Sequence, residues 1–468
     1  MSRARKENLR EPDAAGAAKQ FDWPLAFASE TFLRQRIAGF LARNSFAQQL
    51  AERMRTETGT DFFEWTDHLT LHVENEKALL DLGFVRDSVE TARGEIALHH
   101  PRATLPRVLL TGEHDRPVLA LRPEFVADFV AAHSLPGPIE GAPGSRLRRV
   151  VVSEENGARL EAVERNAYRG FVPAPIHATE LRNFIQAREL WHTRRRCCWS
   201  DDEGFKAAGQ VLARSMELAG RDLSCQFFLE EERRYWESRN HAARVQKRRQ
   251  DSLGLGWGNH DHYTFRCSRH RFVDLVEFLF QIGFVGRERF YAGAGAGWGA
   301  QIAGQPNLGI VVFADVDLLP EETSVDFSRI RLAPAPGLGT VGMWVGLHGE
   351  SFLEAGLHHL GARCDFDLLR AQLEQQGVAT LKPFSDFEFL RQAFTEGERW
   401  PVSRERLRKL VHEGLVTSDQ FETFLKEGAL GSHLETLQRH GGYKGFNQKS
   451  VSVIISATDP RKNPAAAA

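Results

Sequence analysis

The sequence predicts an α+β fold in which two similar, strand-rich halves flank a helical insertion. Three observations predict it. Polar and apolar residues alternate as in strands in 61–175 and again in 256–360. Long charged helical patterns with few Gly or Pro fill the segment between them, and one short motif occurs once in each half. A chain of 468 residues is too long for one simple core, so several structural units are expected.

The elements follow one another in a definite order. The expected segments are 1–20 (a disordered N-terminus), 21–60 (an N-terminal helical segment), 61–175 (the first half), 176–255 (the helical insertion), 256–360 (the second half) and 361–468 (a helical C-terminal region with a terminal strand). Within the second half, TVGMWVGLHGES is expected to be the last strand. In the C-terminal region, DFEFLRQAFTEG is expected to be a helix and SVSVIISA the terminal strand.

Composition excludes several classes of protein. Sixty basic residues balance 62 acidic ones, and the net charge of −2 argues against general binding to nucleic acid or to anionic membranes. No apolar run approaches the roughly 18 residues of a membrane span, and the start carries no apolar signal core. The five cysteines include no CxxC pair, which favours a reducing compartment. We expect a cytoplasmic protein, and the oligomeric state stays undetermined.

A short repeat links the two halves. DHLT at 67–70 and DHYT at 261–264 each precede a strand, a helix and a Gly-Phe-Val, whose Gly-Phe lies at 83–84 and 283–284. The two motif histidines, His68 and His262, lie 262 − 68 = 194 residues apart. We expect a structural duplication with equivalent histidines on the first strand of each half.

The histidines fall on strand faces that can hold a metal. Side chains alternate across a strand, so the even-numbered residues of 68–72 share one face, as do those of 260–266. Imidazole is a good ligand for Fe, Mn, Zn, Ni or Co, and two histidines with one carboxylate complete a facial triad. We therefore expect His68 and His262 to be metal ligands that meet across a cleft between the halves. His72 and His260 are expected to relay protons or contact substrate.

These patterns resemble a known superfamily. A βαβββ-like order with a first-strand histidine in each half is similar to the vicinal-oxygen-chelate superfamily. The segment NHDHYTFR (259–266) resembles, more specifically, the Asn-His-x-Thr-x-Arg motif of the 2-oxoadipate dioxygenase/decarboxylase (hydroxyglutarate synthase) family, which also carries a helical insertion. The resemblance covers roughly residues 60–360. The chain departs from that family at His72, where an Arg is expected, and its carboxylate-ligand motif is not recognisable.

The resemblance implies a fold and an activity. Two vicinal-oxygen-chelate half-domains would form a metal-binding β cleft, and the protein would be a dioxygenase and decarboxylase. Its substrates would be dioxygen and a small 2-oxo acid or related carboxylate, with Fe(II) and no organic cofactor. The superfamily's carboxylate ligand comes from the last strand of the second half, so Glu350 in TVGMWVGLHGES is the expected third ligand. His348, Glu288 and Asp315 remain alternatives.

Substrate contacts are expected from polar residues near this cleft. Arg266 shares the face of His262 and suits two-pronged binding of a carboxylate. Gln301 is expected to point into the cleft, and Lys444 and Asn447 to close over an anionic substrate. Three other functions stay open: a non-oxidative isomerase or lyase using Mn, Ni, Co or Zn as a Lewis acid, a metal-free small-molecule-binding protein, and a helical interaction protein.

Overall fold

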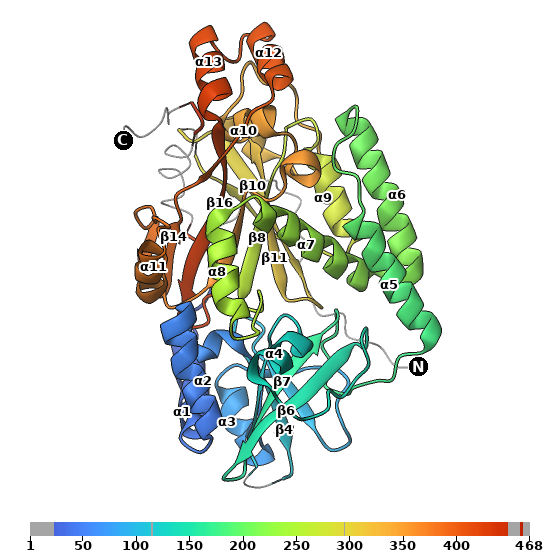
Figure 1. Ribbon diagram of the computed structural model, residues 1–468, viewed down its shortest axis with the longest axis vertical. Helices are drawn as coiled ribbons and strands as arrows, with labels where there is room; N and C mark the ends of the chain where they lie inside the picture. The colour runs from blue at the N-terminus through green and yellow to red at the C-terminus, as the bar shows by residue number, and fades with distance from the viewer. Residues whose placement is uncertain (1–22, 114–115, 294, 448–458, 462–468) are drawn as a thin grey trace.

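The fold is α+β and is organised around two mixed sheets that lie one above the other along the long axis (Figure 1). The computed structural model describes residues 23–113, 116–293, 295–447 and 459–461. The first sheet lies at the bottom of Figure 1 and the second sheet above it. Each sheet has its own buried apolar cluster.

The first sheet has the strand order β2-β3-β4-β1-β5-β7-β6. Its strands are β1 (Thr66–His72), β2 (Val85–Arg86), β3 (Ile96–His99), β4 (Arg107–Thr111), β5 (Val118–Leu121), β6 (Leu147–Glu155) and β7 (Ala158–Arg165). Strand alternation divides β1: Leu69 and Leu71 join the apolar cluster under the N-terminal helices, while His68 and Thr70 face the other way.

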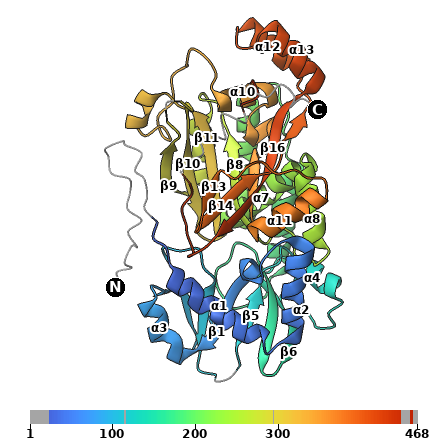
Figure 2. The same ribbon diagram turned by 90° about the vertical axis from the view of Figure 1, so that its left-hand side faces the viewer.

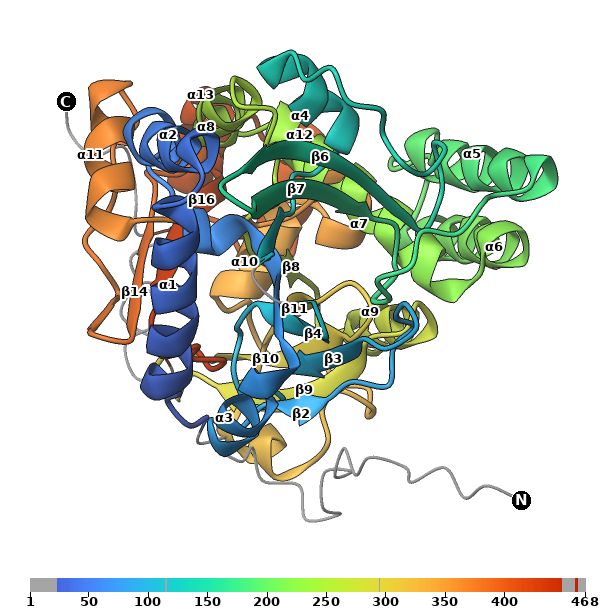
Figure 3. The same cartoon turned by 90° about the horizontal axis from the view of Figure 1, so that it is seen from below.

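N-terminal helices cover the apolar face of the first sheet, as the view from below shows (Figure 3). The helical elements of this part are α1 (Phe27–Leu41), α2 (Ser45–Arg53), η1 (Met54–Thr58), η2 (Phe62–Trp65), η3 (Val73–Asn75), α3 (Glu76–Asp81) and α4 (Val126–His133). The side chain of Asn44 caps α2 by accepting a hydrogen bond from Ala47 N. Leu33, Ile37 and Phe40 of α1 are buried against the sheet.

Four helices form the insertion between the two sheets. They are α5 (Ala178–His192), α6 (Asp201–Ala219), α7 (Arg221–Ser238) and α8 (His241–Asp251). The pair α5 and α6 extends from one side of the molecule, whereas α7 and α8 lie against the second sheet (Figures 1 and 3). Trp236 of α7 is buried against Trp257, so the insertion shares the core of the second sheet.

The second sheet has the strand order β13-β14-β16-β12-β8-β11-β10-β9, and β15 pairs with β16 (Figure 2). Its strands are β8 (His260–Arg266), β9 (Val285–Tyr291), β10 (Trp298–Gln305), β11 (Ile310–Asp317), β12 (His359–Arg363), β13 (Ser385–Phe387), β14 (Leu390–Phe394), β15 (Glu398–Trp400) and β16 (Ala429–Arg439). The accompanying helical elements are α9 (Phe272–Gln281), η4 (Pro320–Ser324), α10 (Thr340–His348), η5 (Ser351–Ala355), α11 (Phe366–Gln375), α12 (Arg404–His412) and α13 (Ser418–Glu427).

Two of the expected elements are wrong. TVGMWVGLHGES was expected to be a strand, but Thr340–His348 form helix α10. The carboxylate of Asp317 accepts hydrogen bonds from the backbone N–H groups of Gly339, Val341 and Gly342, which fixes the helix start by a contact outside the segment. A strand-like composition therefore adopts a helix because tertiary contacts override local propensity.

The region after 360 was expected to be mainly helical, but it also carries strands β12 to β16. DFEFLRQAFTEG, expected to be a helix, contributes β13 and β14 instead. β14 pairs with β16, whose Ala429–Leu437 are all buried, and β13 pairs with β14, so the two strands complete one edge of the second sheet. The expected terminal strand SVSVIISA lies outside the described residues. No helix in the described ranges is both long enough and apolar enough to cross a bilayer.

Candidate metal site

Three adjacent strands of the second sheet bring His262, His359 and Glu435 together. The residues belong to β8, β12 and β16, and one ligand atom from each lies within 4.8 Å of the others. Register explains this. Gly361 of β12 is the backbone partner of both His262 and Glu435, and His359 is two residues away on the same face. Within the described part of the chain this is the one group of three such side chains that could hold a cation.

The ligand atoms point at one another. Oε2 of Glu435 lies 3.1 Å from Nε2 of His262 and 3.3 Å from Nε2 of His359. The other carboxylate oxygen, Oε1, accepts a hydrogen bond of 2.7 Å from Nε2 of Gln392. One carboxylate oxygen and two imidazole nitrogens therefore face a common point, while the rest of the carboxylate is held by β14.

Partners on the far side of each ring fix its orientation. Nδ1 of His262 lies 3.0 Å from Oδ2 of Asp261, and Arg439 donates to both oxygens of that carboxylate at 3.0 Å. Nδ1 of His359 lies 3.0 Å from Nδ1 of His358. Both histidines are thus held through Nδ1, as is usual where an outer partner orients a metal-binding imidazole. Their Nε2 atoms face Glu435, and Nε2 of His359 also lies 2.8 Å from Oγ1 of Thr264, a contact that a bound metal would replace.

The backbone of β12 at Gly361 lies directly against the imidazole ring of His262. A Cβ atom on Gly361 would lie 2.4 Å from Cε1 and 2.6 Å from Nδ1 of His262. A glycine is therefore required opposite His262, because the ring occupies the space that any other side chain would need.

The electrostatics favour a positive charge at the point where the three groups meet. Burial by itself would lower the pKa of His262, but Glu435 and Asp261 raise it to about 9. Burial would raise the pKa of Glu435, but His262 and His359 hold it below its ordinary value. Two imidazoles and one carboxylate are the donor set of the facial triad that binds Fe(II) and similar divalent cations. The residues present therefore fit a divalent metal ion.

An unpaired guanidinium lies on the same strand as His262. Arg266 is 1% exposed, and none of its three side-chain nitrogens has a hydrogen-bond partner among the described residues. Its guanidinium carbon lies 5.7 Å from the centre of the Trp344 ring, and burial lowers its pKa to about 10. Nε2 of His358 and Nε2 of His433 are also buried without a partner there. Unpaired buried polar groups are costly, so this group of side chains suits a polar ligand.

The structure does not bring the other two expected ligands to His262. His68 lies in the first sheet, where its Nδ1 is 2.7 Å from Oδ2 of Asp67. Glu350 follows α10, and its carboxylate accepts hydrogen bonds from the backbone of Ser268. Burial raises the pKa of Glu350 to about 7. The alternative ligand His348 donates from Nε2 to the carbonyl of Leu430. The cluster thus lies inside the second sheet, and not between the two halves as expected.

The remaining expected contacts lie in separate places. His72, at the end of β1, accepts a hydrogen bond from Glu74 N. His260 donates from Nδ1 to the Trp257 carbonyl, and burial together with Arg233 lowers its pKa to about 3. Gln301 donates to the backbone of β9 and β10, Lys444 to the Pro101 carbonyl, and Asn447 to the Phe384 carbonyl. Of the expected substrate contacts, Arg266 is the one that shares the face of the cluster.

Sequence reasoning missed His359 and Glu435. Glu435 was hidden by the expectation of helices after residue 360, and His359 by the expectation that TVGMWVGLHGES was the last strand of the second half. The similarity between AYRGF at 167–171 and GYKGF at 442–446 was a signal that could have found Glu435. The first of these segments follows β7 and the second follows β16, so their similarity indicates that a strand also precedes GYKGF.

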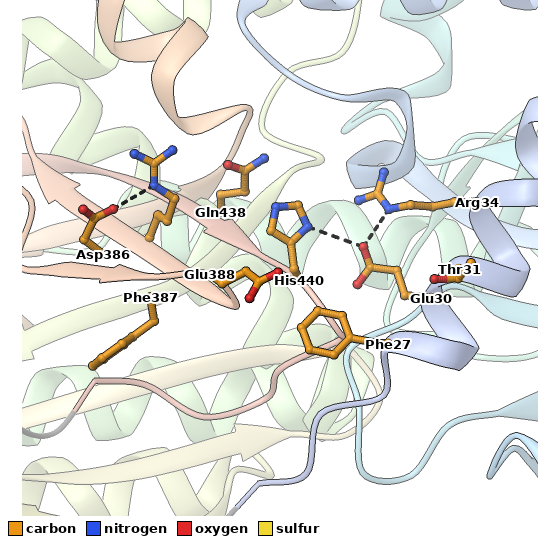
Figure 4. A pocket seen from close by; sticks show the side chains of 10 residues that line it. Phe27, Glu30, Thr31, Arg34, Asp386, Phe387, Glu388, Gln438 and His440 are labelled. Atoms are coloured by element: carbon orange, nitrogen blue, oxygen red, sulfur yellow. Dashed lines mark hydrogen bonds and ion pairs between the residues drawn. The ribbon is translucent and has the colours of Figure 1, made fainter.

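A cavity lies away from the cluster. It has a volume of about 720 Å³ and separates α1 from the β13–β14 hairpin and the end of β16 (Figure 4). Glu30 lies within it, 2.6 Å from Arg34 and 3.6 Å from His440. Arg391 on the other wall pairs with Asp386 at 3.1 Å. The charges that line the cavity largely neutralise each other, and none belongs to the cluster of His262, His359 and Glu435.

No protein-family model and no curated protein sequence matches the chain. Among solved structures, it is similar to a 4-hydroxymandelate synthase variant from Streptomyces coelicolor, with 14% identity, a TM-score of 0.29, and coverage of 86% of this chain and 99% of that one. It is similar to methylmalonyl-CoA epimerase from Mycobacterium tuberculosis, with 13% identity, a TM-score of 0.22, and coverage of 39% and 88%. A xylose isomerase-like TIM barrel/4-hydroxyphenylpyruvate dioxygenase fusion protein gives 11% identity, a TM-score of 0.26, and coverage of 90% and 57%.

Proposed function

We propose that the chain is a metal-dependent enzyme of the vicinal-oxygen-chelate type, with Fe(II) held by His262, His359 and Glu435. The single observation that carries the proposal is the convergence of these side chains within 4.8 Å from three neighbouring strands. A His-His-carboxylate set uses three coordination positions on one side of an ion and leaves the others to substrate.

We further propose that the reaction is dioxygenation with decarboxylation of a small 2-oxo acid or a related carboxylate. The bound metal would supply two things: a template for the two neighbouring oxygens of such an acid, and a redox centre for dioxygen. Support for an acidic substrate comes from Arg266, which is buried, positively charged and unpaired among the described residues. A guanidinium can hold a carboxylate by two parallel hydrogen bonds.

The chain's own residues would then have distinct tasks. Arg266 would hold the substrate carboxylate, and Trp344 beside it would exclude water. Thr264, whose Oγ1 lies 2.8 Å from Nε2 of His359, would give up this contact to a bound metal, because a nitrogen that binds a metal has no lone pair or proton left for the hydroxyl. His359 Nδ1 would donate to His358 Nδ1, because its own Nε2 would be used by the metal; the proton of His358 would then be on Nε2. His358 would thus keep its one N–H on Nε2, which is buried and has no partner among the described residues.

Metal analysis combined with oxygen uptake on a panel of 2-oxo acids tests the proposal. Protein reconstituted with Fe(II) under argon should contain one equivalent, and His359→Ala and Glu435→Gln should lower both metal content and oxygen uptake at least tenfold. His68→Ala is the matched control, because it removes a similarly buried, Asp-paired histidine from the other sheet.

The outcomes separate the alternatives that the sequence left open. Turnover under nitrogen with Mn, Co, Ni or Zn, and none with Fe(II) and oxygen, would replace the oxygenase with an isomerase or lyase. Loss of metal in His68→Ala but not in His359→Ala would refute the assignment of the ligands. A protein that takes up no metal would be a small-molecule-binding or interaction protein.

A further inference from the structure

The first sheet repeats the architecture of the metal-binding sheet. β1 pairs with β4 in parallel and with β5 antiparallel, just as β8 pairs with β11 in parallel and with β12 antiparallel. β5 then pairs in parallel with β7, as β12 does with β16. Even an irregularity is shared, because the register slips by one residue next to His68 and next to His262. The two sheets can therefore be compared position by position.

Register assigns a counterpart in the first sheet to each member of the cluster. His262 corresponds to His68, since each precedes the paired threonine of its strand by two residues. His359 is the partner of Thr264, and the partner of Thr70 is Val118, so these two correspond. Glu435 pairs with Gly361, and the equivalent pair in the first sheet is Glu161 with Ala120. Two of the three ligand types are thus kept, and the third is a valine.

The surroundings of the two histidines are also repeated. Asp67 holds Nδ1 of His68, and Arg165 donates to both oxygens of Asp67 at 2.8 Å. Arg165 also donates to the carbonyls of Tyr168 and Gly170. In the second sheet Arg439 makes the same contacts with Asp261 and with the carbonyls of Tyr443 and Gly445. Contacts that orient a metal-binding imidazole are therefore present in a sheet that lacks a complete ligand set.

Three differences set the first sheet apart, and each disfavours a cation. Val118 supplies no donor atom where the second sheet has an imidazole. Ala120 stands where Gly361 stands, and a Cβ at Gly361 would lie 2.4 Å from the histidine ring, so His68 must sit differently from His262. Arg107 is the partner of His68 where Val311 is the partner of His262. Its guanidinium lies 3.6 Å from Asp67 and 4.4 Å from the centre of the Phe171 ring, which itself contacts His68.

We propose that the first sheet carries a degenerate copy of the divalent-cation site, centred on His68 and Glu161. Three substitutions made together, Val118→His, Ala120→Gly and Arg107→Val, should restore cation binding there. The proposal rests on the assignment of His262, His359 and Glu435 as the working site. The native first sheet binds no transition-metal ion, because the guanidinium of Arg107 lies beside His68 and Val118 stands where the second sheet has an imidazole. His68 has a structural role instead: it contacts Asp67, whose ion pair with Arg165 ties β1 to β7.

Titration with Co(II), followed by calorimetry and by absorption of the bound ion, tests the proposal. The wild-type protein should bind one equivalent, and the triple variant should bind two. The triple variant in a His359→Ala background should bind one. The triple variant with His359→Ala keeps the test independent of the proposed function. The ligand set of the second sheet is incomplete in that protein, so a bound ion would report on the rebuilt set of the first sheet.

Two results would overturn the proposal. One is a second equivalent in the wild-type protein that Glu161→Gln removes, since the native first sheet would then hold a cation. The other is a triple variant with native circular dichroism that gains no equivalent. If the triple variant does not fold, two simpler comparisons remain. The comparison of wild-type protein with Glu161→Gln decides whether the native first sheet binds a cation. Val118→His alone, made in the His359→Ala protein, should raise the weak Co(II) affinity of that protein.

Discussion

Replacing Gly361 by alanine should damage the metal site through one added methyl group. The new Cβ would lie 2.4 Å from Cε1 of His262, 2.6 Å from Nδ1 and 3.0 Å from Nε2. Carbon atoms in contact normally lie about 3.5 Å apart or more, so the ring must retreat by about 1 Å. A ligand displaced by that amount no longer meets the geometry of the other two.

We expect Gly361→Ala to lower the affinity for Mn(II) or Fe(II) by about 10- to 100-fold, which corresponds to about 1.4–2.8 kcal/mol. The strain should also lower the free energy of unfolding by about 1–3 kcal/mol. Affinity is measured by competition with a chelator of known strength, and stability by urea denaturation of the metal-free protein.

Gly39→Ala is the matched control for this substitution. Gly39 lies in α1, and a Cβ there would meet no atom within 4 Å. The control should keep wild-type metal affinity and gain about 0.5–1 kcal/mol of stability from the better helix propensity of alanine. A Gly361→Ala protein that binds metal with the wild-type constant would show that His262 is not a ligand in the position described.

Three further predictions concern buried groups, one away from the cluster (Glu350) and two on its side of the second sheet (Arg266 and His358). Glu350→Gln should leave the metal content unchanged and flatten the pH dependence of stability. Folding raises the pKa of this carboxyl from 4.5 to about 7, so its contribution to stability is complete below pH 4.5 and is lost as the pH rises through 7. Urea denaturation at pH 8 should therefore show a gain of up to about 3 kcal/mol over wild type, and no gain would contradict the raised pKa. Arg266→Met should raise the free energy of unfolding by about 1–3 kcal/mol, because it removes a buried unpaired cation, while weakening carboxylate-substrate binding at least tenfold; a destabilised variant would mean that Arg266 has a partner in solution. His358→Phe should lower metal affinity about 10- to 100-fold in chelator competition, because it frees Nδ1 of His359, and unchanged affinity would show that the ring is held by other contacts.

Local patterns allowed part of the site to be predicted. Strand alternation correctly placed His262, Thr264 and Arg266 in one strand, β8, because a period of two needs only neighbouring residues. It also identified the strand that begins each sheet and the helices between the sheets. The duplication was visible in DHLT and DHYT for the same reason.

The same reasoning failed wherever a distant segment decides the structure. TVGMWVGLHGES is rich in residues that favour strands, yet Asp317 caps it as a helix. The HLETLQR of β16 lies in a region of helical composition, yet it is buried between β12 and β14. The choice of Glu350 as carboxylate ligand required TVGMWVGLHGES to be the last strand of the second half, and it therefore fell on a residue away from His262, whereas Glu435 is the ligand that we propose.

The sequence by itself determined which side chains each strand presents, because a pleated strand must send alternate residues to opposite faces. It determined that an imidazole, a threonine and a guanidinium would follow one another along β8. Only the tertiary structure decided their partners. His359 lies 95 residues after Thr264, and Glu435 lies 173 residues after His262, so their meeting depends on the register of three strands joined by long connections. The two halves carry nearly the same motif, and we propose that strand pairing, together with a valine, an alanine and an arginine, decides which half can hold a metal.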